Sequence, residues 1–70
     1  MATSQPDAAM TDTRVKEILR QAVRTGVIVS WIDLPNGKWT INPQVGRCHD
    51  KTWVEIRSYC RMLERAGVKP

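Results

Sequence analysis

Six basic residues recur at a spacing of four in two segments of the chain. They are Lys16, Arg20 and Arg24 in the first segment and Arg57, Arg61 and Arg65 in the second. Residues four apart lie almost above one another on an α-helix, so each set forms a ridge along one helix. Arginine donates paired hydrogen bonds to phosphate oxygens, and such ridges are suited to the backbone of a nucleic acid. The alternative is an ordinary solvated helix face.

The overall charge favours the first interpretation. Eleven Lys and Arg residues stand against seven Asp and Glu, which gives a formal charge of +4 at pH 7 and a pI near 9.6. A net positive charge on a small protein favours polyanions, because binding releases counterions from the phosphates. If both helices lie on one side of a sheet, the two ridges join into one basic surface, which Lys38 extends. We therefore expect RNA or DNA as a partner of these seven residues.

The run Cys48-His49-Asp50 is the other place where chemistry could occur. Zinc sites use four ligands at spacings such as C-x2-C, and the chain lacks that spacing. A Cys–His nucleophile pair needs the two side chains to face each other, which adjacency does not ensure. The chain also lacks a glycine-rich phosphate loop and a G-x-S-x-G motif. We expect no catalytic residue, no metal, no cofactor and no small-molecule substrate.

Two helices must position the basic ridges. Apolar residues at helical spacing predict a helix over residues 12–25, with Asp12 or Thr13 as its N-cap. The sequence "TWVE" at 52–55 is a capping box, in which a Thr hydroxyl and a Glu carboxylate each bind the other residue's backbone N–H. It predicts a second helix over residues 52–66.

The sequence "WIDLPNGKWTIN" at 31–42 predicts a hairpin between strands over 27–34 and 38–41. Asn36-Gly37 alone could form a two-residue type I′ turn. Alternatively, Pro35-Asn36-Gly37 forms a type I turn closed by a glycine bulge, which the proline favours. The choice decides which face each strand residue occupies, because a slip by one residue reverses every side chain.

The bulged turn predicts the composition of both faces of the hairpin. The inner face then holds Val27, Val29, Trp31, Trp39 and Ile41, and the tryptophans are core residues. With the opposite assignment, the tryptophans are an exposed platform for bases or a partner. The outer face holds three aliphatic residues that would form a partner interface, with a second copy or another protein: Ile28, Ile32 and Leu34.

These elements predict an α+β domain of order α-β-β-(β)-α, with two helices packed on one face of a small antiparallel sheet. A third strand around Val45–Cys48 and a plain loop are both compatible with the sequence. Residues 1–11 lack an apolar pattern and are expected to form a disordered N-terminal arm, leaving 12–70 as one domain.

Cellular context is limited to a few expectations. Cys48 and Cys60 are too few for a disulfide framework, and we expect both thiols to be reduced. The sequence contains no apolar run of membrane-spanning length and no signal peptide pattern. We expect a cytoplasmic protein that does not act at a membrane.

The run "VKEILRQAVRTGVIVSWIDLPNGKWTI" and the later "MLERAG" resemble the small HicA-type toxins in element order and apolar pattern. The resemblance implies a fold like that of double-stranded-RNA-binding domains, and action on messenger RNA through a histidine on a strand near the hairpin. The strand "KWTIN" has no histidine, and His49 comes later. The resemblance therefore implies RNA or DNA binding by a basic helical face, without nuclease activity. The alternative function is a protein-interaction module that uses the outer face of the hairpin.

Overall fold

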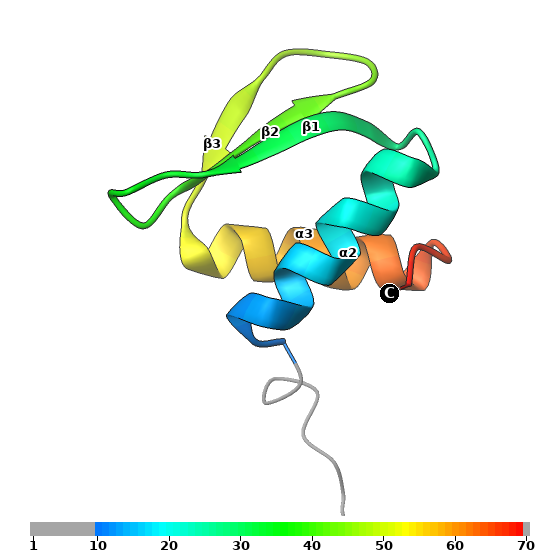
Figure 1. Ribbon diagram of the computed structural model, residues 1–70, viewed down its shortest axis with the longest axis horizontal. Helices are drawn as coiled ribbons and strands as arrows, with labels where there is room; N and C mark the ends of the chain where they lie inside the picture. The colour runs from blue at the N-terminus through cyan, green and yellow to red at the C-terminus, as the bar shows by residue number, and fades with distance from the viewer. Residues whose placement is uncertain (1–9, 70) are drawn as a thin grey trace, which may run out of the picture.

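The computed structural model describes residues 10–69 and has an α+β architecture (Figure 1). Its elements are α2 (Asp12–Arg24), β1 (Ile28–Asp33), β2 (Trp39–Pro43), β3 (His49–Lys51) and α3 (Trp53–Arg65). The strands form an antiparallel sheet of order β1-β2-β3, and both helices lie on one face of it. The expected fold class is confirmed, with the third strand at 49–51 and not at Val45–Cys48. Neither described helix is long and apolar enough to cross a membrane.

Helix α2 begins at Asp12, as the predicted range did, but its N-cap lies one residue before that. Thr11 is the N-cap, because its extended backbone lets the hydroxyl accept the backbone N–H of Arg14 at 3.2 Å. The expected cap at Asp12 or Thr13 is therefore wrong. Met10 is buried in the core, so residues 10 and 11 belong to the folded domain. The rest of the expected arm, residues 1–9, lies outside the described residues.

The capping box at the start of α3 is confirmed. The Thr52 hydroxyl accepts the Glu55 N–H at 3.3 Å, and the Glu55 carboxylate accepts the Thr52 N–H at 2.8 Å. These two bonds satisfy backbone groups that a helix end otherwise leaves without partners. The box fixes where α3 begins and hence the register of the arginines along it.

The hairpin uses the bulged turn. The Leu34 carbonyl accepts the Gly37 N–H at 3.2 Å, and the Leu34 N–H donates to the Lys38 carbonyl at 2.8 Å. Gly37 has φ +84°, a left-handed conformation that a glycine adopts without strain. In the resulting register Asp33 faces Trp39, as the bulged turn predicted.

A second irregularity lies at the other end of β1. Ile28 pairs with Pro43 and Ser30 pairs with Asn42, so Val29 is an extra residue on β1. A bulge of this kind shifts the alternation of side chains by one position. Residues before the bulge therefore face the side opposite to the one expected from the hairpin register.

This bulge overturns part of the predicted assignment of faces. Ile28, expected on the outer face, is 1% exposed and belongs to the core. Val27 and Val29, expected to be inward, are 39% and 48% exposed. The assignment of Ile28 to a partner interface is therefore wrong.

The tryptophans are part of the core. Trp39 is 3% exposed, and its ring centroid lies 5.9 Å from that of Trp31 and 6.1 Å from that of Trp53. Trp31 and Trp53 are partly buried against the same cluster. The alternative of an outward-facing tryptophan platform is therefore excluded.

Candidate functional site

A basic groove lies between the two helices, and we call it the interhelical groove. It is lined by Arg14 of α2, by Arg61, Glu64 and Arg65 of α3, and by Lys69. The chain reaches Lys69 because Gly67, with φ +100°, turns it back at the end of α3. Val68 is then buried, and its N–H donates to the Leu63 carbonyl at 2.9 Å. This anchored turn holds Lys69 beside the arginines.

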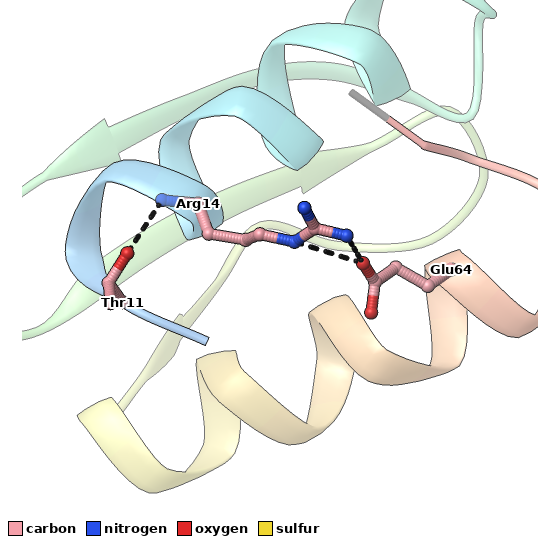
Figure 2. Close-up of polar contacts among 3 residues, drawn as sticks. All are labelled: Thr11, Arg14 and Glu64. Carbon is pink, nitrogen blue, oxygen red and sulfur yellow. Dashed lines mark hydrogen bonds and ion pairs between the residues drawn. The ribbon is translucent and has the colours of Figure 1, made fainter. Parts of the chain in front are cut away.

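Arg14 spans the groove (Figure 2). Its Nε donates to Oε2 of Glu64 at 3.2 Å, and its Nη2 donates to the same oxygen. The Arg14 and Glu64 side chains are 39% and 24% exposed. The contact joins α2 to α3 at a position that solvent still reaches.

The groove carries an excess of positive charge. Within the described part of the chain, four lining residues are cationic, and Glu64 is the one that carries a carboxylate. Two of the cations, Arg61 and Arg65, lie one helical turn apart on α3. Guanidinium groups bind phosphate oxygens through paired N–H donors, so the arrangement suits a chain of phosphates.

Two residues of each predicted ridge line a hollow, and the two hollows are separate. Arg61 and Arg65 line the interhelical groove. Arg20 and Arg24 line a second hollow together with Glu17 and Gln21, which we call the α2 outer face. The apolar stripe of α2 faces the core, and Arg20 and Arg24 are exposed on the other side of the helix.

The other three predicted residues are used differently. Lys16 Nζ lies 3.2 Å from an Asp12 carboxylate oxygen and 3.6 Å from one of Asp33. The Arg57 guanidinium lies over the Trp53 ring, 5.8 Å from its centroid. Lys38 is exposed beside the hairpin turn. None of these three side chains lines the interhelical groove.

Sequence reasoning missed two groove residues, Arg14 and Lys69. Arg14 lies outside the four-residue spacing of the first ridge, immediately before the buried Val15. A charged residue next to a buried apolar residue can face a neighbouring helix. Glu64, which follows the buried Leu63, is such a residue on α3. This complementary pair was the signal available in the sequence, but it becomes useful only once the helices are known to be neighbours.

The predicted partner interface is reduced by the burial of Ile28. Ile32 is 55% exposed, whereas Leu34 is partly buried. Ile32 therefore stands as the one predicted interface residue with a largely exposed side chain.

The groups around His49 do not assemble into a site. His49 and Cys48 are exposed, and Cys48 is a free thiol. The Asp50 carboxylate accepts a hydrogen bond from the Thr40 hydroxyl at 2.8 Å. Across residues 10–69, no group of three or more His, Cys, Asp or Glu side chains could hold a metal ion.

The second thiol, Cys60, is also free and lies in the core. Burial raises the pKa of Cys60 to about 12, and the negative charge of Glu64 acts in the same direction. The Cys60 thiol is therefore a neutral core group at ordinary pH.

Comparison of the chain with protein-family models, with curated proteins and with solved structures gives no match.

Proposed function

We propose that this protein binds nucleic acid through phosphate contacts in the interhelical groove, without catalysis. The observation that carries the proposal is the gathering of Arg14, Arg61, Arg65 and Lys69 around one hollow, where Glu64 is the one carboxylate that residues 10–69 contribute. Cations that share a concave surface attract a chain of phosphates more strongly than the same cations dispersed over the molecule.

The shape and chemistry of the groove favour a polymer over a small substrate. The groove is open to solvent, so an extended anion can continue beyond it. Contacts of this kind set affinity and orientation but do not read base sequence. The single histidine, His49, is not among the groove residues, which favours binding without cleavage.

Two matched double variants test the proposal. Arg61→Gln with Arg65→Gln removes two charges from the groove, and Arg20→Gln with Arg24→Gln removes two charges at the same spacing from the α2 outer face. Fluorescence anisotropy of a labelled oligonucleotide at several salt concentrations gives the affinity of each variant. Loss of two phosphate contacts is expected to weaken binding about 50-fold near 0.1 M salt and to reduce the salt slope by about 1.8.

The outer-face variant is expected to lose less than about fivefold, because its charges act at longer range through screening solvent. Equal losses in both variants would mean that net charge alone drives binding. Absence of binding by the unmodified protein to both RNA and DNA would remove the proposal.

Protein binding through the hairpin is the second candidate function. The observation that favours it is the exposure of Val29 and Ile32, at 48% and 55%, on the edge strand β1. Exposed apolar residues on an edge strand can pair with another chain. Sedimentation of the protein and of an Ile32→Lys variant tests it. A concentration-dependent dimer that the substitution abolishes would support it, and a strict monomer would exclude self-association.

A further inference from the structure

Arg14 is held by a carboxylate at the position where the proposed ligand would bind. Both Nε and Nη2 of its guanidinium donate to Oε2 of Glu64 (Figure 2). The same fork of N–H donors is the part of arginine that binds two phosphate oxygens. Glu64 therefore occupies the Nε and Nη2 donors of Arg14, one of the two donor pairs through which a guanidinium binds phosphate.

The geometry points to Glu64 as an internal competitor that makes the groove selective for chains of phosphates over isolated anions. This inference rests on the proposed function, and it deepens it by naming a specificity-determining residue. In the complex, a phosphate oxygen accepts the Arg14 hydrogen bonds, and the Glu64 carboxylate turns out to solvent. No covalent bond changes in this exchange.

The selectivity follows from the difference between tethered and free anions. Glu64 lies on the neighbouring helix, so its carboxylate competes at a high effective concentration, which a single phosphate ion in solution does not match. A phosphate chain has the same advantage once Arg61, Arg65 and Lys69 hold its neighbouring groups, because the next phosphate is then also delivered locally. A polyanion therefore displaces Glu64 from Arg14 more readily than an isolated anion does.

The side chains are placed so that this exchange is possible. The Glu64 side chain is 24% exposed and the Arg14 side chain 39%, so neither is sealed in the core. An ion pair that solvent reaches has a small net free energy, because its Coulomb attraction is screened. The exchange therefore costs little, and it needs no movement of the helices, whose contact also includes the apolar stripe of α2.

The test compares Glu64→Gln with a matched control, Glu17→Gln. Both changes remove one negative charge near arginines, but Glu17 lies on the α2 outer face with Arg20 and Arg24. Two probes are used in solution with the full chain: a labelled oligonucleotide, followed by anisotropy, and inorganic phosphate, followed by NMR shifts of the arginine side-chain N–H groups.

We expect Glu64→Gln to bind the oligonucleotide about fivefold more tightly near 0.1 M salt, because binding no longer has to break the ion pair between Arg14 and Glu64. The unmodified protein is expected to show no Arg14 Nε shift with inorganic phosphate, and Glu64→Gln is expected to show one. The control is expected to change oligonucleotide affinity by less than about twofold, since its charge lies outside the groove.

Three outcomes would overturn the inference. Oligonucleotide affinity unchanged in Glu64→Gln would show that Glu64 does not compete. An equal increase in oligonucleotide affinity in Glu64→Gln and Glu17→Gln would show that only the change in net charge matters. Adding Arg14→Gln to Glu64→Gln should abolish the gain, and a gain that persists would exclude Arg14 as the group released. Failure of every form to bind any nucleic acid would instead remove the proposed function and this inference with it.

Discussion

The indole rings of Trp39 on β2 and Trp53 in the first turn of α3 lie 6.1 Å apart at an interplanar angle of 31°. The Trp31 ring on β1 also stacks on Trp39, with 5.9 Å between the two ring centroids. Trp39 is thus the centre of a row of three rings that connects the sheet to the helix carrying Arg61 and Arg65. Because tilted and offset aromatic pairs add to the stability given by burial, this row fixes α3 against the sheet.

Trp39→Ala is expected to lower the free energy of unfolding by about 3–5 kcal/mol, since it removes the largest buried side chain of the row and leaves a cavity. That loss is comparable to the total stability of a small domain. Urea denaturation followed by circular dichroism measures it. Trp53→Ala, at a partly buried position, is expected to cost less. An equal or larger loss in Trp53→Ala would contradict the central role of Trp39.

Ile28→Ala and Ile32→Ala, on the same strand, are expected to differ sharply. Ile28 is 1% exposed, and its truncation should cost about 2–5 kcal/mol. Ile32 is 55% exposed, and its truncation should change stability by less than about 0.5 kcal/mol. Denaturation of the two variants under identical conditions is the measurement. The reverse order would mean that β1 lacks the bulge at Val29.

The same bulge marks the limit of what the sequence predicts about the fold. The capping box at Thr52 and the turn at Pro35-Asn36-Gly37 are local signals, and both predictions are confirmed. The extra residue at Val29 has no local signal, because valine fits a regular strand as well as a bulge. The bulge lies at the start of β1, where the chain has just left α2, and the burial of Ile28 in the core there is a tertiary contact. Alternation alone therefore placed Ile28 on the wrong face.

The candidate site was predictable in part for a similar reason. The four-residue spacing of Arg61 and Arg65 is visible in the sequence, and both residues line the groove. The four-residue spacing of Asp12 and Lys16 is visible as well, but Asp33 approaches Lys16 only when β1 packs beside α2. The role of Arg14 likewise becomes clear only when its partner Glu64, on the other helix, is known to lie beside it. Spacing along a helix gives the direction of a side chain, but the charges that face it come from distant segments.

Thr52→Ala is expected to lower the free energy of unfolding by about 1 kcal/mol, because the N-cap hydroxyl no longer accepts the Glu55 N–H. Urea denaturation at neutral pH measures the change. Thr52→Ser retains the hydroxyl and should restore most of the loss. A loss of the same size in the serine variant would indicate that the threonine methyl group, and not the cap, is responsible.

The Glu55 side of the capping box predicts an acid dependence. Hydrogen bonds from the Thr52 backbone and side chain lower the pKa of Glu55 below its ordinary value of 4.5. Its contribution to stability is therefore present above pH 4.5 and is lost as the pH falls through the lowered pKa of the folded state. Glu55→Gln should remove this part of the acid dependence in denaturation curves. An unchanged pH profile would contradict the carboxylate's role.

The buried thiol of Cys60 makes stability depend on pH in the alkaline range, where stability falls as the pH rises. Burial raises its pKa to about 12 from an ordinary value of 9.0, so the unfolded chain loses this proton at a lower pH than the folded protein. The contribution is fully present below pH 9 and is lost as the pH rises toward 12. Denaturation midpoints of Cys60→Ala should fall less steeply across this range than those of the unmodified protein.

Substitutions of Lys16 and Arg61 are expected to affect nucleic-acid binding differently. The sequence predicted both as phosphate-binding residues, but the structure gives them different neighbours. Lys16 lies beside Asp12 and Asp33, outside the interhelical groove, whereas Arg61 lines that groove. Arg61→Gln is expected to weaken oligonucleotide binding about eightfold near 0.1 M salt and to reduce the salt slope by about 0.9. Lys16→Gln should change affinity by less than about twofold, since solvent screens charges beyond roughly 10 Å at this ionic strength. Anisotropy titrations of the two single variants, with circular dichroism to confirm folding, make the comparison. A larger loss from Lys16→Gln would move the binding surface away from the groove and toward the side of α2 that faces β1.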